Sequence, residues 1–187
     1  KMGFRSQSGR IICLGHQSFQ HDHKGQLMLV EWHSTTIKRV CRSTLQAETI
    51  SLLHCAELTE HLRIVFHGLR HKHDQRDRKW LVTAQDMIPA NWYTDCKSLE
   101  QHVNQAGTHV VTDKRLAIDL CGLRQQVWRQ GGEEVGDPLL TDFLPENRTT
   151  KLTWIPTEKM PADCLTKAMK PGALSLIMNG QDRKSVV

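Results

Sequence analysis

Two short apolar runs open the chain, and each is bounded by residues that favour turns. The first is Ser8–Gly15 and the second is Gln26–Trp32. Apolar runs of this length between glycines and polar residues are typical of β-strands. The polar stretch 16–25 between them is longer than the tightest hairpin turns, so we expect a hairpin with an extended loop.

A long helix is predicted next. From Ser43 to Leu69 apolar residues recur at helical spacing, and no proline or glycine interrupts them until Gly68. Ser43 or Thr44 can cap the start of this helix, and Gly68 lies where a helix terminator is expected. The charged stretch 70–79 then reads as a loop.

The second half of the chain alternates between strand and helix patterns. Strands are predicted at 90–95 and 151–155, helices at 98–103 and 112–130, and a final helical segment from Pro161 that Pro171 interrupts. The stretch 131–150, rich in turn residues, forms the longest predicted loop. The order strand, strand, helix, strand, helices, strand, helix predicts an α/β fold with helices packed on a sheet.

Composition bounds the class of protein. A chain of 187 residues suits one core, and 39% hydrophobic with 24% charged residues is ordinary for a folded domain. The 25 Lys and Arg exceed the 20 Asp and Glu, giving a formal charge of +5. A basic surface attracts polyanions, which favours nucleic acid only weakly.

Cysteine spacing and hydropathy indicate the cellular compartment in which the protein is expected. The six cysteines are widely scattered and lack the paired short spacing of a structural zinc site, so we expect reduced thiols. No secretory signal and no apolar stretch of about 18 residues is present. We therefore expect a cytoplasmic or nuclear protein without a membrane partner.

Two carboxylates stand at unusual positions in the predicted elements. Glu48 lies three residues after Leu45 and four before Leu52, on the apolar stripe of the long helix, where a charge needs a partner. In the alternative interpretation the helix register is looser and Glu48 is solvated. Asp95 ends a strand, where α/β proteins place ligand-binding groups, although it also suits a turn or a cap ahead of Ser98.

A third carboxylate, Asp163, lies two residues after Pro161 in the first turn of a predicted helix. The helix dipole favours an acid there without any function. Taken together with Glu48 and Asp95, it completes a set of hard oxygen ligands of the kind that Mg²⁺ prefers.

Four segments, in order along the chain, carry a family resemblance. They are Val30-Glu-Trp-His-Ser-Thr-Thr-Ile-Lys-Arg-Val-Cys-Arg-Ser-Thr-Leu-Gln-Ala-Glu48, Tyr93-Thr-Asp-Cys-Lys-Ser-Leu99, Thr112-Asp-Lys-Arg-Leu-Ala-Ile-Asp119 and Trp154-Ile-Pro-Thr-Glu-Lys-Met-Pro-Ala-Asp-Cys-Leu-Thr-Lys167. Together they resemble the ribonuclease H-like domain at the end of copia-type retrotransposon Pol polyproteins. The third segment departs from that family, because Leu116 and Ala117 replace its usual His.

The resemblance implies a fold and an activity. It implies a ribonuclease H-like mixed sheet flanked by helices over 1–170, with a helical end and tail over 171–187. Glu48, Asp95 and Asp163 would be three of four acidic ligands for Mg²⁺, with Mn²⁺ as a substitute. The implied endonuclease hydrolyses RNA in RNA/DNA hybrids by a two-metal mechanism, beside an upstream reverse-transcriptase part of the polyprotein.

The basic stretch before the long helix offers contacts for such a substrate. Lys38, Arg39 and Arg42 are our candidates for nucleic-acid binding through phosphates, and the 2′-hydroxyl would distinguish RNA from DNA. The alternative is a solvated basic loop.

One departure from the family affects the expected activity. The family carries its first catalytic Asp on a strand shortly before a Ser-x-Ser-Gly turn, and Ser6–Gly9 resembles that turn, but residues 1–7 hold no Asp or Glu. Asp22 lies after the turn and cannot substitute by position. We therefore expect a chain that begins inside the domain, lacks the first, central strand, exposes two sheet edges and cleaves weakly or not at all.

Three other functions stay open. The chain could be a catalytically inactive structural or nucleic-acid-binding relic of a reverse-transcriptase polyprotein. It could bind metal through His21-Asp-His23 or His71-Lys-His73, although no cysteine accompanies either motif. An integrase core could pair Asp95 with Glu133 or Glu134, but a long helix before the Asp strand fits the ribonuclease H order better.

Overall fold

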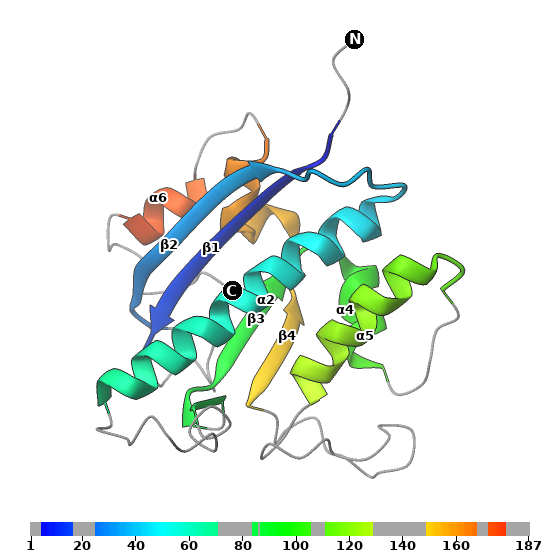
Figure 1. Cartoon of the computed structure of the whole chain (residues 1–187). Helices are drawn as coiled ribbons and strands as arrows, with labels where there is room; N and C mark the ends of the chain where they lie inside the picture. Colours follow the sequence, from blue (N-terminus) through cyan, green and yellow to red (C-terminus); the bar gives the residue numbers. More distant parts are fainter. Residues whose placement is uncertain are drawn as a thin grey trace. The chain divides into compact units, whose positions relative to one another are not determined.

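The structure is a computed structural model that describes residues 5–16, 25–70, 84–85, 87–105, 111–128, 149–167 and 172–178. These residues form a mixed α/β arrangement with small sheets (Figure 1). The elements are β1 (Gln7–Gly15), β2 (Leu27–Thr36), α2 (Thr44–Arg70), β3 (Ala90–Thr94), α4 (Lys97–Asn104), α5 (Lys114–Trp128), β4 (Thr150–Trp154), the 3₁₀ helices η2 (Thr157–Lys159) and η3 (Pro161–Leu165), and α6 (Gly172–Met178). The predicted α/β class and the order of strands and helices are confirmed.

The chain divides into two compact units that interleave along the sequence. Unit 1 comprises Lys1–Leu52, Tyr93–Lys97 and Trp154–Val187, and unit 2 comprises Leu53–Trp92 and Ser98–Thr153. The division at residue 170 expected from the sequence stays a prediction.

In unit 1, β1 and β2 form the predicted antiparallel hairpin. Their register runs from Gln7 opposite Thr36 to Gly15 opposite Leu27, with an irregularity between Ile12 and Cys13. The predicted loop lies largely outside the described residues. β2 continues four residues beyond its predicted end at Trp32, because the ladder with β1 extends to Thr36.

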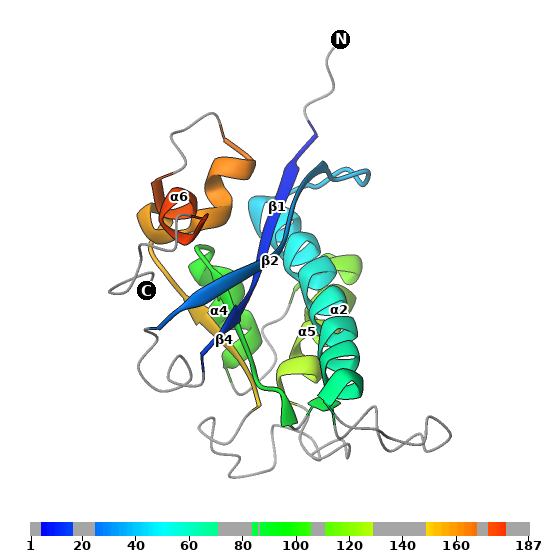
Figure 2. The same ribbon diagram turned by 90° about the vertical axis from the view of Figure 1, so that its left-hand side faces the viewer.

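The C-terminal part of unit 1 packs on this hairpin. Figure 2 shows η3 and α6 lying on one side of β1 and β2. The Ser34 hydroxyl donates a hydrogen bond of 2.6 Å to the carbonyl of Leu165, which ties η3 to β2. A Cβ added at Gly9 would lie 2.8 Å from Thr166 Cγ2 and 3.0 Å from the Ala162 carbonyl oxygen. The contact between β1 and η3 therefore requires a residue without a side chain.

The start of α2 is fixed by two reciprocal side-chain bonds. The Gln46 backbone N–H donates to Ser43 Oγ at 3.1 Å, as the predicted cap requires, and the Arg42 N–H donates to Gln46 Oε1 at 2.8 Å. A small apolar cluster of Ile37, Ala47, Ile50 and the partly buried Cys41 packs behind this first turn.

The long helix predicted over Ser43–Leu69 is confirmed as α2, although Gly68 lies inside the helix, which ends at Arg70. A glycine in a helix interior costs about 1 kcal/mol relative to alanine, which a 27-residue helix can accommodate.

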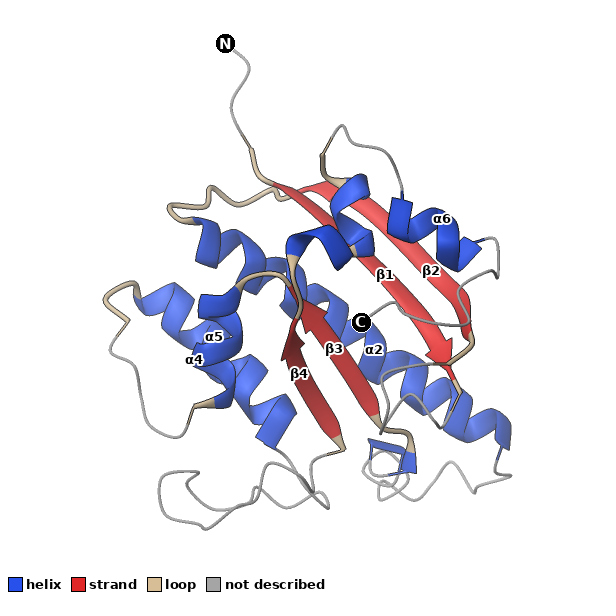
Figure 3. Ribbon diagram, turned by 180° about the vertical axis from the view of Figure 1, so that it is seen from behind, coloured by secondary structure: helices blue, strands red, loops and turns tan. Residues whose placement is uncertain are grey.

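The second sheet consists of β3 and β4. The Ala90 N–H donates to the Thr149 carbonyl, and the Ile155 N–H donates to the Thr94 carbonyl. The partner numbers rise together along both strands, so the strands are parallel, as Figure 3 shows.

Unit 2 is held together by an apolar core and by one buried cation. Its fully buried side chains include Leu99, Val103, Leu123 and Val127, and the part of α2 in this unit lies beside α5 (Figures 1 and 2). Arg63 is 3% exposed.

The Arg63 guanidinium donates to acceptors from three parts of unit 2. They are the Glu60 carboxylate at 2.6 Å, the Gln85 carbonyl at 2.6 Å, the Ile88 carbonyl, and Thr150 Oγ1 at 2.9 Å. A buried guanidinium is stable only when its donors are satisfied in this way.

Within the described part of the chain, no helix is both long and apolar enough to cross a bilayer.

We predict that Gly9→Ala destabilises the protein by about 1–3 kcal/mol, because the new methyl group would overlap a backbone oxygen and a short side chain. The free energy of unfolding by urea measures the effect. Gly68→Ala is the control, since nothing lies within 4 Å of its added Cβ and helix propensity favours alanine. Equal stability of the two variants would contradict the tight contact between β1 and η3.

Candidate functional site

Glu48 lies early in α2, just after the capped first turn. It is half-buried, and its neighbours Ala47, Thr49 and Ile50 are buried. The cap formed by Ser43 fixes where the helix begins, and so fixes the direction in which the fifth helical residue projects. Glu48 is therefore held on a rigid element and is partly removed from water.

Asp95 follows β3 directly and is tied to the chain after β4. Its Oδ2 accepts a hydrogen bond of 3.2 Å from the Thr157 hydroxyl, and its backbone carbonyl accepts one of 3.0 Å from the indole N–H of Trp154. These bonds hold the carboxylate at the end of the strand.

Asp163 is the most buried of the three predicted acids, at 8% exposure. It lies in the 3₁₀ helix η3, whereas the sequence predicted the first turn of a helix without specifying its type. Its Oδ2 accepts a hydrogen bond of 2.7 Å from the ammonium group of Lys167. Its backbone carbonyl accepts bonds from the N–H groups of Thr166 and Lys167, so the turn itself sets this pair.

Glu48 interacts electrostatically with both of the other acids within unit 1. Burial raises the pKa of Glu48 above its ordinary value of 4.5, and the charges of Asp95 and Asp163 raise it further. Lys167 acts in the opposite direction and lowers the pKa of Glu48. The structure thus brings residues from α2, the end of β3 and η3 into one electrostatic environment.

The Lys167 ammonium is part of the same group. Its hydrogen bond to Asp163 is the largest cause of its raised pKa, and the charges of Asp163, Asp95 and Glu48 contribute in turn. The site is therefore three carboxylates with one cation among them.

Carboxylate oxygens are the ligands that Mg²⁺ and Mn²⁺ prefer, so the donor chemistry suits either ion. In the described segments, however, no group of three or more His, Cys, Asp or Glu residues is arranged closely enough to hold a metal ion. Glu48, Asp95 and Asp163 thus provide suitable donors without forming a closed ligand shell.

Comparisons of the chain with protein-family models, with curated proteins and with solved structures found no match. The resemblance carried by the four sequence segments stays a prediction, and the site is interpreted from its own contacts.

Several residues at the site were not predicted from the sequence. Lys167 stands four residues after Asp163, a spacing at which a lysine can reach an acid in a helical turn, and this signal could have revealed it. Thr157 and Trp154 reach Asp95 from about sixty positions away, which no local pattern encodes. The Lys97 ammonium lies 5.8 Å from the centroid of the Trp154 ring, whose indole N–H donates to the Asp95 carbonyl.

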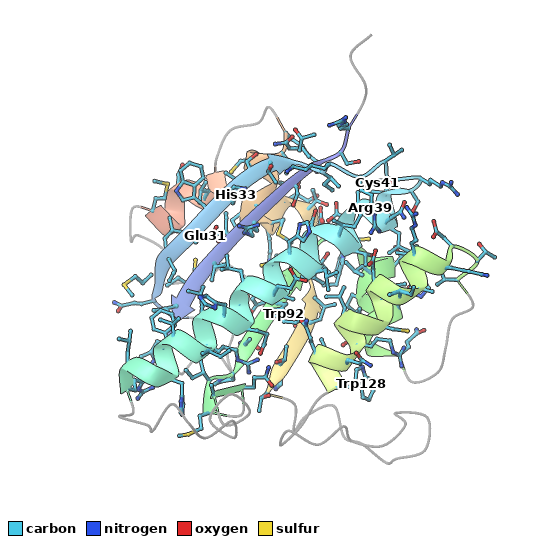
Figure 4. The ribbon with its side chains drawn as sticks, viewed as in Figure 1. Glu31, His33, Arg39, Cys41, Trp92 and Trp128 are labelled. Atoms are coloured by element: carbon cyan, nitrogen blue, oxygen red, sulfur yellow. The ribbon has the colours of Figure 1, made fainter. Side chains whose placement is uncertain are left out.

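The predicted basic residues lie between β2 and α2. Lys38, Arg39 and Arg42 are exposed, and Figure 4 shows Arg39 and Cys41 in this segment. Their role in binding nucleic acid stays a prediction. The alternative metal ligands His21, His23, His71 and His73, the integrase candidates Glu133 and Glu134, and Asp22 lie outside the described residues.

We predict that Glu48→Gln stabilises the metal-free protein at pH 7. Because the folded-state pKa of Glu48 is raised, its ionised form costs folding free energy, and this cost develops as the pH rises above the unfolded-state value near 4.5. The advantage of the variant should therefore be present at pH 7 and disappear below pH 4.5. Denaturation in EDTA across this range measures it.

The matched control is Glu57→Gln, which removes an exposed carboxylate from the same helix. It should not share the pH-dependent gain. A Glu48→Gln variant that is less stable than the parent at pH 7 would show that the charge of Glu48 is favourably paired.

Proposed function

We propose that this chain is a ribonuclease H-type domain that hydrolyses the RNA strand of RNA/DNA hybrids with the help of divalent metal ions. The observation that supports it best is that the charges of Asp95 and Asp163 act on the half-buried Glu48. These are the acids that the family resemblance implies as metal ligands.

The energetic state of the acids favours a cation-binding role. Like charges held near one another, partly out of water, cost free energy unless a cation compensates them. The pKa of Glu48 is raised first by burial and then by the charges of Asp95 and Asp163, and the charge of Lys167 opposes this rise. A divalent ion, whose charge is twice that of lysine, would offset more of it.

Each acid would hold the ion with a different support. Glu48 is oriented by the capped start of α2, Asp95 by its bond from Thr157, and Asp163 by the turn of η3. Bound there, a divalent metal would supply an activated water and stabilise the charge of the leaving oxygen. Such supports matter because catalytic ligands must be held in place before the substrate arrives.

The substrate class follows from the resemblance and from the charge of the chain. A formal charge of +5 and the exposed Lys38, Arg39 and Arg42 favour a polyanion. An RNA strand would be distinguished from DNA through its 2′-hydroxyl groups.

A second candidate function is hybrid binding without cleavage. The resemblance implies four acidic ligands, and residues 1–7, where it places the first of them, contain no Asp or Glu. Three acids should hold a pair of metal ions poorly. We therefore expect slow cleavage by this chain, and the binding role would remain if cleavage were lost.

A digestion assay tests the proposal. We expect the chain to cut the RNA of a labelled RNA/DNA hybrid in Mg²⁺ or Mn²⁺, and to leave a DNA duplex intact. Asp95→Asn should lower the rate at least about 100-fold, because a metal ligand is lost, while Glu57→Gln should not change it. Binding without any metal-dependent cleavage would establish the second function, and neither binding nor cleavage would refute both.

We predict that Lys38→Ala/Arg39→Ala weakens hybrid binding and its dependence on salt. Each lost phosphate contact makes the slope of log affinity against log salt less steep by about 0.9. The slope of the double variant should therefore be less steep than that of the parent by up to about 2. The matched control is Lys114→Ala/Arg115→Ala, which removes two exposed charges from the start of α5. Equal slopes for the two double variants, measured by fluorescence anisotropy, would show that the segment before α2 is not the contact.

A further inference from the structure

An exposed tryptophan stands at the carboxyl end of β4. Trp154 is 40% exposed, whereas Leu152 and Ile155, near it in the chain, are buried. Its indole N–H donates to the Asp95 carbonyl at 3.0 Å. Since that N–H is the only polar atom of an indole group, what the side chain exposes is apolar. The bond fixes one edge of the ring and leaves an aromatic surface in contact with water.

A positive charge accompanies this ring. The Lys97 ammonium lies 5.8 Å from the centroid of the Trp154 ring, close enough for a cation–π interaction. Lys97 is exposed. An ammonium group has three N–H donors, and a ring face offers them no lone pair, so Lys97 can still donate to an anion. The two residues therefore present an aromatic surface and a positive charge together.

The pair lies at the edge of the sheet where α/β proteins bind their ligands. β3 and β4 are parallel, so both end at the same edge (Figure 3). The Ile155 N–H donates to the Thr94 carbonyl at 2.9 Å, which joins the two strand ends. Lys97 and Trp154 stand at these ends, and both belong to unit 1. Ligands of α/β proteins bind beyond the carboxyl ends of the strands, so the exposed ring is well placed to contact one.

We propose that Trp154 and Lys97 bind a nucleotide of single-stranded nucleic acid. The base stacks on the indole ring, and the Lys97 ammonium holds an adjoining phosphate. Proteins commonly bind single strands through aromatic rings beside positive charges, because every base has a face that can stack. Since the ammonium lies 5.8 Å from the ring centroid, one nucleotide can contact both groups. The inference goes beyond the proposed function, because it concerns unpaired nucleotides and needs neither a metal ion nor cleavage.

The Asp95 carboxylate restricts the ligands that suit this site. The indole bonds to the backbone of Asp95, and the Oδ2 of the same residue accepts a hydrogen bond of 3.2 Å from the Thr157 hydroxyl. A negative charge is therefore held near the ring, and it would repel a second phosphate. The site thus suits the separated phosphates of a strand better than the clustered charges of a triphosphate.

Binding of a fluorescein-labelled oligothymidylate by the full chain in EDTA, followed by fluorescence anisotropy, tests the inference. Trp154→Leu removes the ring, and we expect about tenfold weaker binding, because a stacked base is lost. Trp154→Phe keeps an aromatic ring and should retain most of the affinity. The matched control is Trp32→Leu, which removes a tryptophan that is 58% exposed on β2 and should leave the affinity unchanged.

The charge of Lys97 is tested separately. Lys97→Met keeps a stem of similar length and removes the phosphate contact, so the slope of log affinity against log salt should become less steep by about 0.7. Lys97→Arg should keep the slope of the parent. Lys114→Met, which removes an exposed lysine from the start of α5, is the control and should also keep it. Because Lys97 is exposed, Lys97→Met decides the matter if Trp154→Leu fails to fold.

The contrary outcomes distinguish this inference from the proposed function. Equal affinity of the parent and Trp154→Leu, a loss of the same size in Trp32→Leu, or an unchanged salt slope in Lys97→Met would overturn the inference. Absence of binding in EDTA would also refute it, while cleavage of RNA/DNA hybrids in Mg²⁺ could still occur. A chain that binds the oligothymidylate but neither binds nor cuts the hybrid would refute the proposed function and leave the single-strand site in place.

Discussion

The cost of holding Glu48 partly out of water, close to the charges of Asp95 and Asp163, is the constraint on which the candidate site depends. Glu48, Asp95 and Asp163 come from separate parts of the sequence, and folding brings their negative charges together. Native proteins have only a small margin of stability, so such an arrangement persists only if other interactions offset it. Lys167 supplies part of that offset through its bond to Asp163.

The rest of unit 1 holds these charges where they are. The reciprocal bonds between Ser43, Gln46 and the Arg42 backbone fix the first turn of α2, and bonds from Thr157 and Trp154 fix the residue after β3. The third acid depends on the seating of η3 against the hairpin. None of these supports carries chemistry of its own. They convert a flexible chain into a set of fixed positions for charged groups.

The sequence predicted the elements and two of the acids from patterns that are local. An apolar stripe broken by Glu48 and a strand that ends on Asp95 are visible within a few residues. Gly68 was expected to terminate the helix but lies inside it, because glycine is compatible with a helix as well as with its end. The bonds of Arg63 to Thr150, and of Thr157 to Asp95, join positions far apart in the sequence, so no local pattern could reveal them.

Gly9 shows how a residue without functional groups can govern an acidic site. A Cβ added at Gly9 in β1 would meet Ala162 and Thr166, which stand before and after Asp163 and lead directly to Lys167. Any side chain at this position would push the turn outward and carry both charged groups with it. The arrangement of Asp163 and Lys167 would thus depend on the absence of a side chain at Gly9, a residue that carries no charge and takes no part in the site's chemistry.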